Sequence, residues 1–177
     1  MEPPHAVEDK AWAEARLGPE RVRFAYAWRR LRETGAHLTF NADNPGSDHD
    51  IFYGLHAAVT RRDEDLRPPE GWYRDQALTM DEALRAYTRW AARAAFMDAD
   101  TGRIETGRRA DLTVLSLDPF TAAVERPGDL LGGEVLMTIV NGRIAFDGRA
   151  EGSAAVHGAG APRRDGPSGA LVEGAGP

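Results

Sequence analysis

Apolar side chains recur at helical spacing near the start of the chain. A short helix is predicted over Lys10 to Arg16, with Asp9 able to cap it. A longer helix is predicted from Pro19 to Gly35, since proline suits a first helical turn and glycine suits a helix end. The apolar stripe of this second helix has i, i+4 and i+7 spacing and consists of Phe24, Trp28 and Leu31.

A further helix is predicted in the middle of the chain by a capping pattern. Thr79 and Glu82 form a T-x-x-E sequence, in which each side chain can bond to the backbone N–H of the other residue. Apolar residues then follow at helical spacing, which predicts one buried face through Phe96. The residues on that face are Leu84, Tyr87, Ala91 and Ala94.

Runs typical of β-structure occur in two regions. A short buried strand is predicted over His37 to Phe40. Two longer strands are predicted over Leu112 to Leu117 and Val135 to Val140, where branched and apolar residues dominate. Asn141-Gly142 suits the positive φ values of a tight hairpin turn, so Arg143 to Phe146 is predicted to pair back across it.

Residues 41–78 are rich in turn-forming residues around one apolar segment, Ile51 to Val59. Asp43 stands at the start of this region, just after the predicted strand and next to Asn44-Pro45. A strand end holds a side chain rigidly, so a carboxylate there can act as a metal ligand or proton shuttle. Aspartate beside proline is also a common turn former, and spacing alone leaves both interpretations open.

Composition excludes several classes of protein. The 177 residues are 42% hydrophobic, which is enough for a core, and the net charge of −6 is spread among interspersed acids and bases, which argues against nucleic-acid binding. The chain has no cysteine, which excludes disulfides and thiolate metal sites. No apolar run reaches about 18 residues and the start has no signal-peptide pattern, so we expect no membrane interaction and a cytoplasmic location.

Several motifs, in a fixed order, together resemble the carboxyl-terminal part of one enzyme family. These segments are PPHAVEDKAWAEARLGPERVRFAYAWR (Pro3 to Arg29), NADNPGSDHDIFYGLHAAVTRR (Asn41 to Arg62), GWYRDQALTMDEALRAYTRWAARAAF (Gly71 to Phe96), TGRIETGRRADLTVLSLDPF (Thr101 to Phe120) and VLMTIVNGRIAFDG (Val135 to Gly148). They resemble amidohydrolase family 3, a group of metal-dependent amidohydrolases, from about Met1 to Gly148.

The resemblance implies an α/β fold: a partial TIM (β/α)₈ barrel, namely its last two βα units, plus closing strands of a small β-sandwich domain. Residues 1–100 would belong to the barrel and residues 101–149 to the β-sandwich. A complete barrel needs about 250 residues, so this chain cannot contain one. Residues 150–177 are small, polar and rich in proline and glycine, and we expect them to be disordered.

The same resemblance makes Asp43 the catalytic candidate. In this superfamily a divalent metal activates water, and the aspartate at the end of the last barrel strand ligates the metal and moves a proton to the leaving group. The chain departs from the family pattern at two places. Glu2 stands where glutamine is usual, and Asn41-Ala42 replaces the Gly-Ser that usually precedes Asp43.

Other polar residues are candidates for substrate binding. His5 lies in the family's histidine-containing motif and can face substrate, or it can be a hydrogen-bonded rim residue. His49 follows Asp43 in the same loop and can contact substrate, as can its neighbour Asp50. Arg61 can bind a substrate carboxylate in bidentate fashion, although a surface ion pair is the alternative. His56 can equally be a packed helical residue.

The resemblance implies metal-dependent hydrolysis of non-peptide carbon–nitrogen bonds in a small amide, with zinc as the expected metal of the complete parent. The family's remaining ligands, including a His-x-His pair, have no matching segment here. We therefore expect this chain, as a truncated fragment, to hold no metal stably and to be inactive alone. The alternatives are a noncatalytic interaction module, or one half of a split barrel whose amino-terminal half is a separate partner chain.

Overall fold

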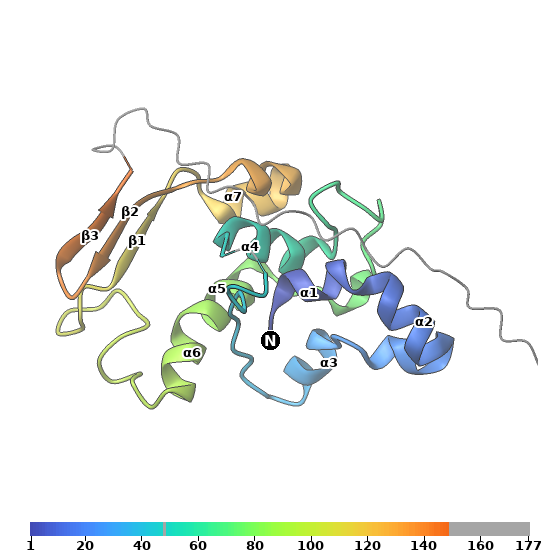
Figure 1. Ribbon diagram of the computed structural model, residues 1–177. Helices are drawn as coiled ribbons and strands as arrows, with labels where there is room; N and C mark the ends of the chain where they lie inside the picture. Colours follow the sequence, from blue (N-terminus) through green and yellow to red (C-terminus); the bar gives the residue numbers. More distant parts are fainter. Residues whose placement is uncertain (48, 149–177) are drawn as a thin grey trace, which may run out of the picture.

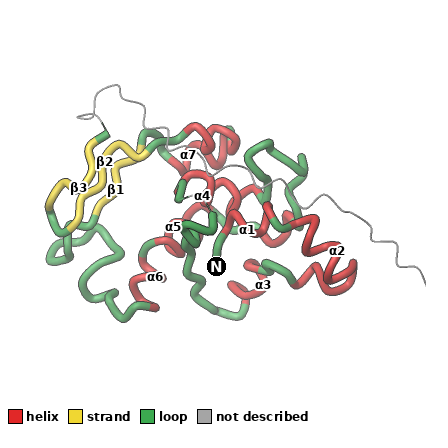
Figure 2. Tube along the Cα trace, viewed as in Figure 1, coloured by secondary structure: helices red, strands yellow, loops and turns green. Residues whose placement is uncertain are grey.

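The structure is a computed structural model that describes residues 1–47 and 49–148. It consists of a helical body with a small sheet at one end (Figures 1 and 2). The helices of the body are α1 (Pro3–Glu8), α2 (Lys10–Arg21), α3 (Trp28–Glu33), α4 (Ile51–Thr60), α5 (Met80–Tyr87) and α6 (Arg89–Ala94), with short 3-10 helices η1 (Val22–Phe24) and η2 (Arg74–Gln76). The sheet contains β1 (Leu112–Leu115), β2 (Val135–Val140) and β3 (Arg143–Asp147), and α7 (Pro119–Glu125) and η3 (Pro127–Gly132) lie between β1 and β2 in sequence.

Helix α4 forms the centre of the core. Its side chains Phe52 and Leu55 are fully buried, and the helix packs against α1, α5 and η3. Burial of each such side chain stabilises the fold by about 1.5–3 kcal/mol. Gly54 allows the close approach of α5, because a Cβ at this position would clash with the Tyr87 hydroxyl. Among the described residues, none of the helices has the length and hydrophobicity of a membrane span.

The predicted capping box at the start of α5 is confirmed. The Thr79 hydroxyl accepts the Glu82 N–H at 3.3 Å, and the Glu82 carboxylate accepts the Thr79 N–H at 3.0 Å. The predicted single helix is divided, however, because Thr88 has non-helical dihedral angles and separates α5 from α6. The helix also ends before Phe96, which is 94% exposed, so the predicted burial through this residue is wrong.

The predicted helix from Pro19 to Gly35 is wrong as a single element. The chain leaves helical geometry at Ala25 and Tyr26, and α3 begins only at Trp28. Phe24 is 57% exposed whereas Trp28 is fully buried, so the predicted stripe does not form one face. Tertiary contacts hold this break, since the Tyr26 hydroxyl donates to Asp9 and the Tyr26 carbonyl accepts a bond from Arg61.

The carboxyl-terminal sheet confirms the predicted hairpin. The strands pair antiparallel in the order β1-β2-β3, with Leu112 opposite Ile139 and Val140 opposite Arg143. The turn between β2 and β3 has φ values of 50° at Asn141 and 77° at Gly142, as a tight hairpin requires. Leu115 of β1 and the nearby Leu117 pack against the helical core, which attaches the sheet to the body.

The predicted strand over His37 to Phe40 is not formed as a β-strand. The Thr39 carbonyl accepts a bond from the Met1 amine at 2.8 Å, and the Phe40 N–H donates to the Ala86 carbonyl of α5 at 3.0 Å. A strand requires a ladder of bonds to a neighbouring strand, and these contacts to a terminus and a helix do not supply one.

The described residues therefore form a mixed α/β structure with one three-stranded antiparallel sheet, and they contain no barrel. The predicted division between residues 1–100 and 101–149 stays a prediction. The predicted disordered segment, 150–177, lies outside the described residues.

Candidate functional site

The loop that carries Asp43 lies against the amino-terminal end of α1. Pro3 begins α1, so the chain from Met1 to Glu2 leads directly into the helix. The Asn41 N–H donates to the Met1 carbonyl at 3.2 Å, and the Asn41 side-chain amide donates to a Glu2 carboxylate oxygen at 3.0 Å. These bonds bring the two segments together although they are about 40 residues apart in sequence.

Asp43 occupies a strained turn that presents its carboxylate to solvent. Its φ of 54° is left-handed, and its N–H donates to the Asn41 side-chain oxygen at 2.8 Å. Its carbonyl accepts the Gly46 N–H at 2.5 Å, which closes the turn. Gly46 leaves room for the carboxylate, because a Cβ there would lie 2.9 Å from Asp43 Oδ2. The side chain is 62% exposed, so solvent or a substrate can reach it.

His5 on α1 stands between two carboxylates. Its Nε2 lies 3.9 Å from Asp43 Oδ2, and its Nδ1 lies 3.9 Å from Glu2 Oε2. Neither contact is a direct hydrogen bond, but both are within the range of charge attraction when the imidazole is protonated. The arrangement of an exposed carboxylate beside an imidazole can hold and move a proton. The structure thus brings together two predicted residues, Asp43 and His5.

Two further candidates, His49 and Asp50, end the loop that carries Asp43 and directly precede α4. His49 is exposed and lies just before Asp50. Asp50 caps α4, because its carboxylate accepts the Phe52 N–H at 2.8 Å. His56 lies within α4 and is fully buried, which agrees with the alternative that it is a packed helical residue.

Arg61 lies in the core, so the predicted alternative of a surface ion pair is wrong. Its side chain is 0% exposed, with the guanidinium 4.3 Å from the ring centre of Trp28 and 5.2 Å from that of Trp72. It donates to the carbonyls of Trp72 at 2.9 Å and Tyr26 at 3.2 Å. Burial lowers the Arg61 pKa to about 10. A contact with a substrate carboxylate stays a prediction, and it would require these structural bonds to break.

The residues around Asp43 do not form a self-contained metal centre. A catalytic zinc is held by three protein ligands at about 2 Å. In residues 1–47 and 49–148, no three His, Asp or Glu side chains converge closely enough to hold a metal ion. Asp43 and His5 can contribute to such a centre only together with ligands from elsewhere.

Sequence reasoning missed the residues that position Asp43. Glu2 was noticed only as a departure from a family pattern, yet it bonds Asn41 and approaches His5. Asn41 both orients Glu2 and accepts the Asp43 N–H. The Asn-x-Asp spacing could have signalled this side-chain-to-backbone turn. The approach of Glu2 depends on tertiary structure and has no local signal.

Comparisons with known proteins agree on one family. The sequence profile described as "Amidohydrolase family" matches residues 1–146. The YtcJ protein of Bacillus subtilis (strain 168), an amidohydrolase by name, is 31% identical over 147 residues, which cover 83% of this chain and 27% of YtcJ. The N-substituted formamide deformylase of Arthrobacter pascens is 34% identical over 119 residues, which cover 67% of this chain and 21% of that enzyme.

A solved structure is also similar to this chain. A metal-dependent hydrolase of Pyrococcus horikoshii OT3, itself uncharacterized, shares 30% sequence identity with this chain and superposes with a TM-score of 0.59. The matched region covers 72% of this chain and 25% of the hydrolase. The chain thus spans about a quarter of the length of the relatives it matches.

Proposed function

The chain belongs to the amidohydrolase family, and we propose that it supplies the proton-transferring aspartate, Asp43, of a metal-dependent hydrolase of small amides or cyclic amides. The observation that supports this proposal is the exposed Asp43 carboxylate, which a left-handed turn holds beside His5. We further propose that the chain corresponds to the last two βα units of the family's barrel and to strands of its β-sandwich.

The proposed reaction breaks a non-peptide carbon–nitrogen bond. Asp43 accepts a proton from water as the water oxygen bonds to the substrate carbonyl carbon. It then gives that proton to the leaving nitrogen as the carbon–nitrogen bond breaks, which returns Asp43 to the carboxylate form. His5 lies beside this carboxylate, with its Nε2 3.9 Å from Asp43 Oδ2. His49 is proposed to contact substrate from the rim of the same loop, since its side chain is exposed there.

The metal of this reaction, with zinc as the expected ion, would supply activated water and polarise the carbonyl. The described residues do not hold it by themselves. Its other ligands would therefore come from segments outside residues 1–47 and 49–148, or from another chain.

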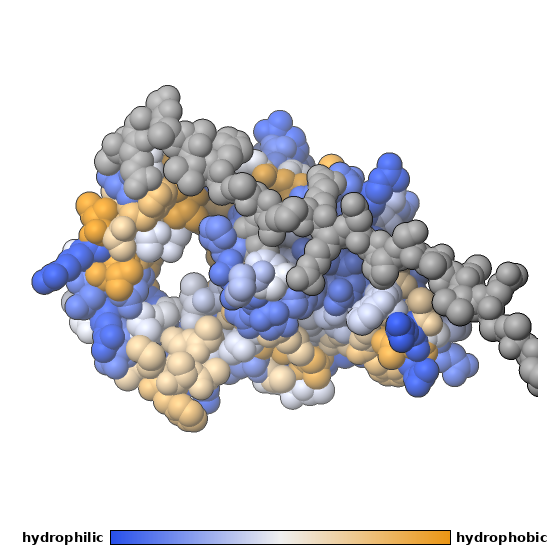
Figure 3. Space-filling view, viewed as in Figure 1, coloured by the Kyte–Doolittle hydropathy of each residue, from blue (hydrophilic) through white to orange (hydrophobic). Residues whose placement is uncertain are grey.

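A second candidate function is a noncatalytic one, in which the chain is an interaction module or one half of a two-chain barrel. The incomplete ligand set favours this reading. The sheet also presents apolar side chains to solvent, and Figure 3 shows apolar surface gathered over it. Ile144 is 60% exposed, and Val140 and Phe146 are exposed as well. Such exposed apolar patches are typical of interaction surfaces.

A chimera separates the two candidates. The matching segment of the N-substituted formamide deformylase would be replaced by that of this chain, and release of formate would be measured. We expect the chimera to be active and Asp43→Asn to lower kcat by about 100-fold or more without unfolding, because an amide cannot accept the proton.

The matched control is Asp65→Asn, which changes another exposed aspartate and should leave turnover unchanged. Near-normal turnover of the Asp43→Asn chimera would show that Asp43 is only a turn residue. A folded, metal-loaded chimera without activity would favour the noncatalytic candidate.

A further inference from the structure

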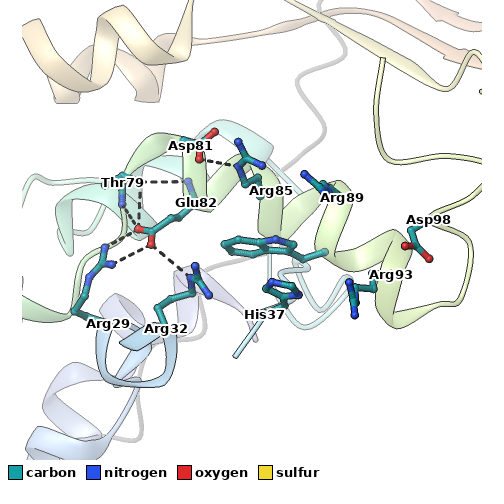
Figure 4. A pocket seen from close by; sticks show the side chains of 11 residues that line it. Arg29, Arg32, His37, Thr79, Asp81, Glu82, Arg85, Arg89, Arg93 and Asp98 are labelled. Carbon is teal, nitrogen blue, oxygen red and sulfur yellow. Dashed lines mark hydrogen bonds and ion pairs between the residues drawn. The ribbon is translucent and has the colours of Figure 1, made fainter. Parts of the chain in front are cut away.

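A polar cavity lies away from Asp43, and the proposed function does not use it. The cavity has a volume of about 550 Å³ and lies between α3, the two helices α5 and α6, and the segment at His37 (Figure 4). Its volume is in the range typical of small-molecule sites. Neither Asp43 nor His5 belongs to its lining.

The lining carries an excess of positive charge on a protein whose net charge is −6. Five arginines and three carboxylates face the cavity. Two of these carboxylates are already engaged: Glu82 accepts bonds from Arg29 at 2.6 and 3.0 Å, and Asp81 accepts a bond from Arg85 at 2.7 Å. The positive excess therefore remains after the internal ion pairs are formed.

Arg89 and Arg93 supply most of the unpaired charge, which the third carboxylate of the lining, Asp98, offsets in part because it forms no ion pair among the described residues. Both arginine side chains are exposed, and among the described residues neither takes part in an ion pair or a side-chain hydrogen bond. They lie one turn apart on α6, at i and i+4. Like charges at this spacing destabilise a helix, and a bound anion would relieve that repulsion.

The wall of the cavity is rigid. Trp90 is buried, and the His37 ring stacks on it with ring centres 5.2 Å apart and an interplanar angle of 9°. The Arg32 guanidinium lies 4.4 Å from the Trp90 ring centre. The Arg32 guanidinium is held in place by a bond from Nη1 to the Ala36 carbonyl and by an ion pair, with its Nε 3.5 Å from Glu82 Oε1. A preformed wall with fixed donors lowers the entropy cost of binding.

We propose that this cavity binds a small multivalent anion, with phosphate or carboxylate groups, through Arg89 and Arg93. Guanidinium groups bind both kinds of anion through paired, charge-assisted hydrogen bonds. Arg32 and His37 lie at the same wall and would limit the size of the ligand.

Isothermal titration calorimetry of the whole chain at an ionic strength of about 0.15 M, where the Debye length is about 8 Å, tests the proposal, with pyrophosphate and citrate in separate titrations. We expect one-to-one binding of at least one anion with a Kd below about 1 mM, weakened by about tenfold or more in the double variant Arg89→Gln/Arg93→Gln. The preferred anion would identify the phosphate or the carboxylate class.

The control is Arg126→Gln/Arg143→Gln, which removes the same charge from exposed positions outside the cavity. This control should bind the preferred anion within about twofold of the unaltered chain, since long-range effects of exposed charges are weak. Absence of saturable binding by the unaltered chain, or equal weakening in both double variants, would overturn the proposal. The altered arginines are exposed, so folding should be kept, and circular dichroism checks this.

Discussion

Glu82 joins two parts of the helical body through one carboxylate. It accepts bonds from Arg29 of α3 at 2.6 and 3.0 Å and from the Thr79 N–H at 3.0 Å. Burial raises the pKa of Glu82, but these bonds outweigh it and lower the pKa from 4.5 to about 2. Because the folded pKa is below the unfolded one, the contribution to stability is present above pH 4.5 and is lost as the pH falls towards 2.

We predict that Glu82→Gln lowers the free energy of unfolding at pH 7 by on the order of 2–3 kcal/mol, and by much less near pH 2. Urea unfolding at the two pH values measures this difference. The neighbouring variant Asp81→Asn is the control, because its ion pair with Arg85 is largely exposed and should change stability by less than about 1 kcal/mol. Equal losses for Glu82→Gln at both pH values would contradict the pKa argument.

Single residues differ in how well the sequence predicts their surroundings. The turn at Asp43, one of two interpretations that the sequence leaves open, has a local signal in Asn44-Pro45. The burial of Arg61 has no local signal, because the two tryptophans around it lie 33 and 11 residues away in sequence. An arginine without a carboxylate partner is an unusual core residue, so its charge alone suggested a surface position.

Elements whose signals are local were predicted well. The capping box of α5 and the Asn-Gly hairpin each depend on a few adjacent residues, and both are confirmed. The helix predicted from Pro19 to Gly35 failed because distant groups, Asp9 and Arg61, bond to Tyr26 and favour a break. Periodicity records which residues are apolar, but it does not record such tertiary bonds.

We predict that Thr79→Ala destabilises the chain by about 1 kcal/mol, because the Glu82 N–H loses its acceptor. Amide hydrogen exchange should become faster first in the opening turn of α5. Thr79→Ser keeps the hydroxyl and should retain most of the stability. If Thr79→Ser and Thr79→Ala lose the same amount, the hydroxyl bond is not the source of the effect.

At the scale of the whole molecule, the family could be recognised from the sequence. The predicted part of a barrel, however, is not present in the described residues. Motif order alone gave the family that the profile match over residues 1–146 shows. The segment His37 to Phe40 has the composition of a barrel strand, yet among the described residues its backbone hydrogen bonds go to Met1 and to Ala86 of α5, not to a neighbouring strand. Strand formation depends on a neighbouring strand, and sequence composition does not show whether one is present.

The incomplete ligand set leads to a prediction for the purified chain. Asp43 has one imidazole nearby, at 3.9 Å, whereas a stable zinc centre needs three or four ligands at about 2 Å. We therefore expect equilibrium dialysis to show zinc binding weaker than about 100 μM, with little change in Asp43→Ala. Asp65→Ala, another exposed aspartate, is the control for nonspecific loss of charge. Stoichiometric binding at micromolar zinc, abolished by Asp43→Ala but not by Asp65→Ala, would show that this chain assembles a metal centre without further ligands.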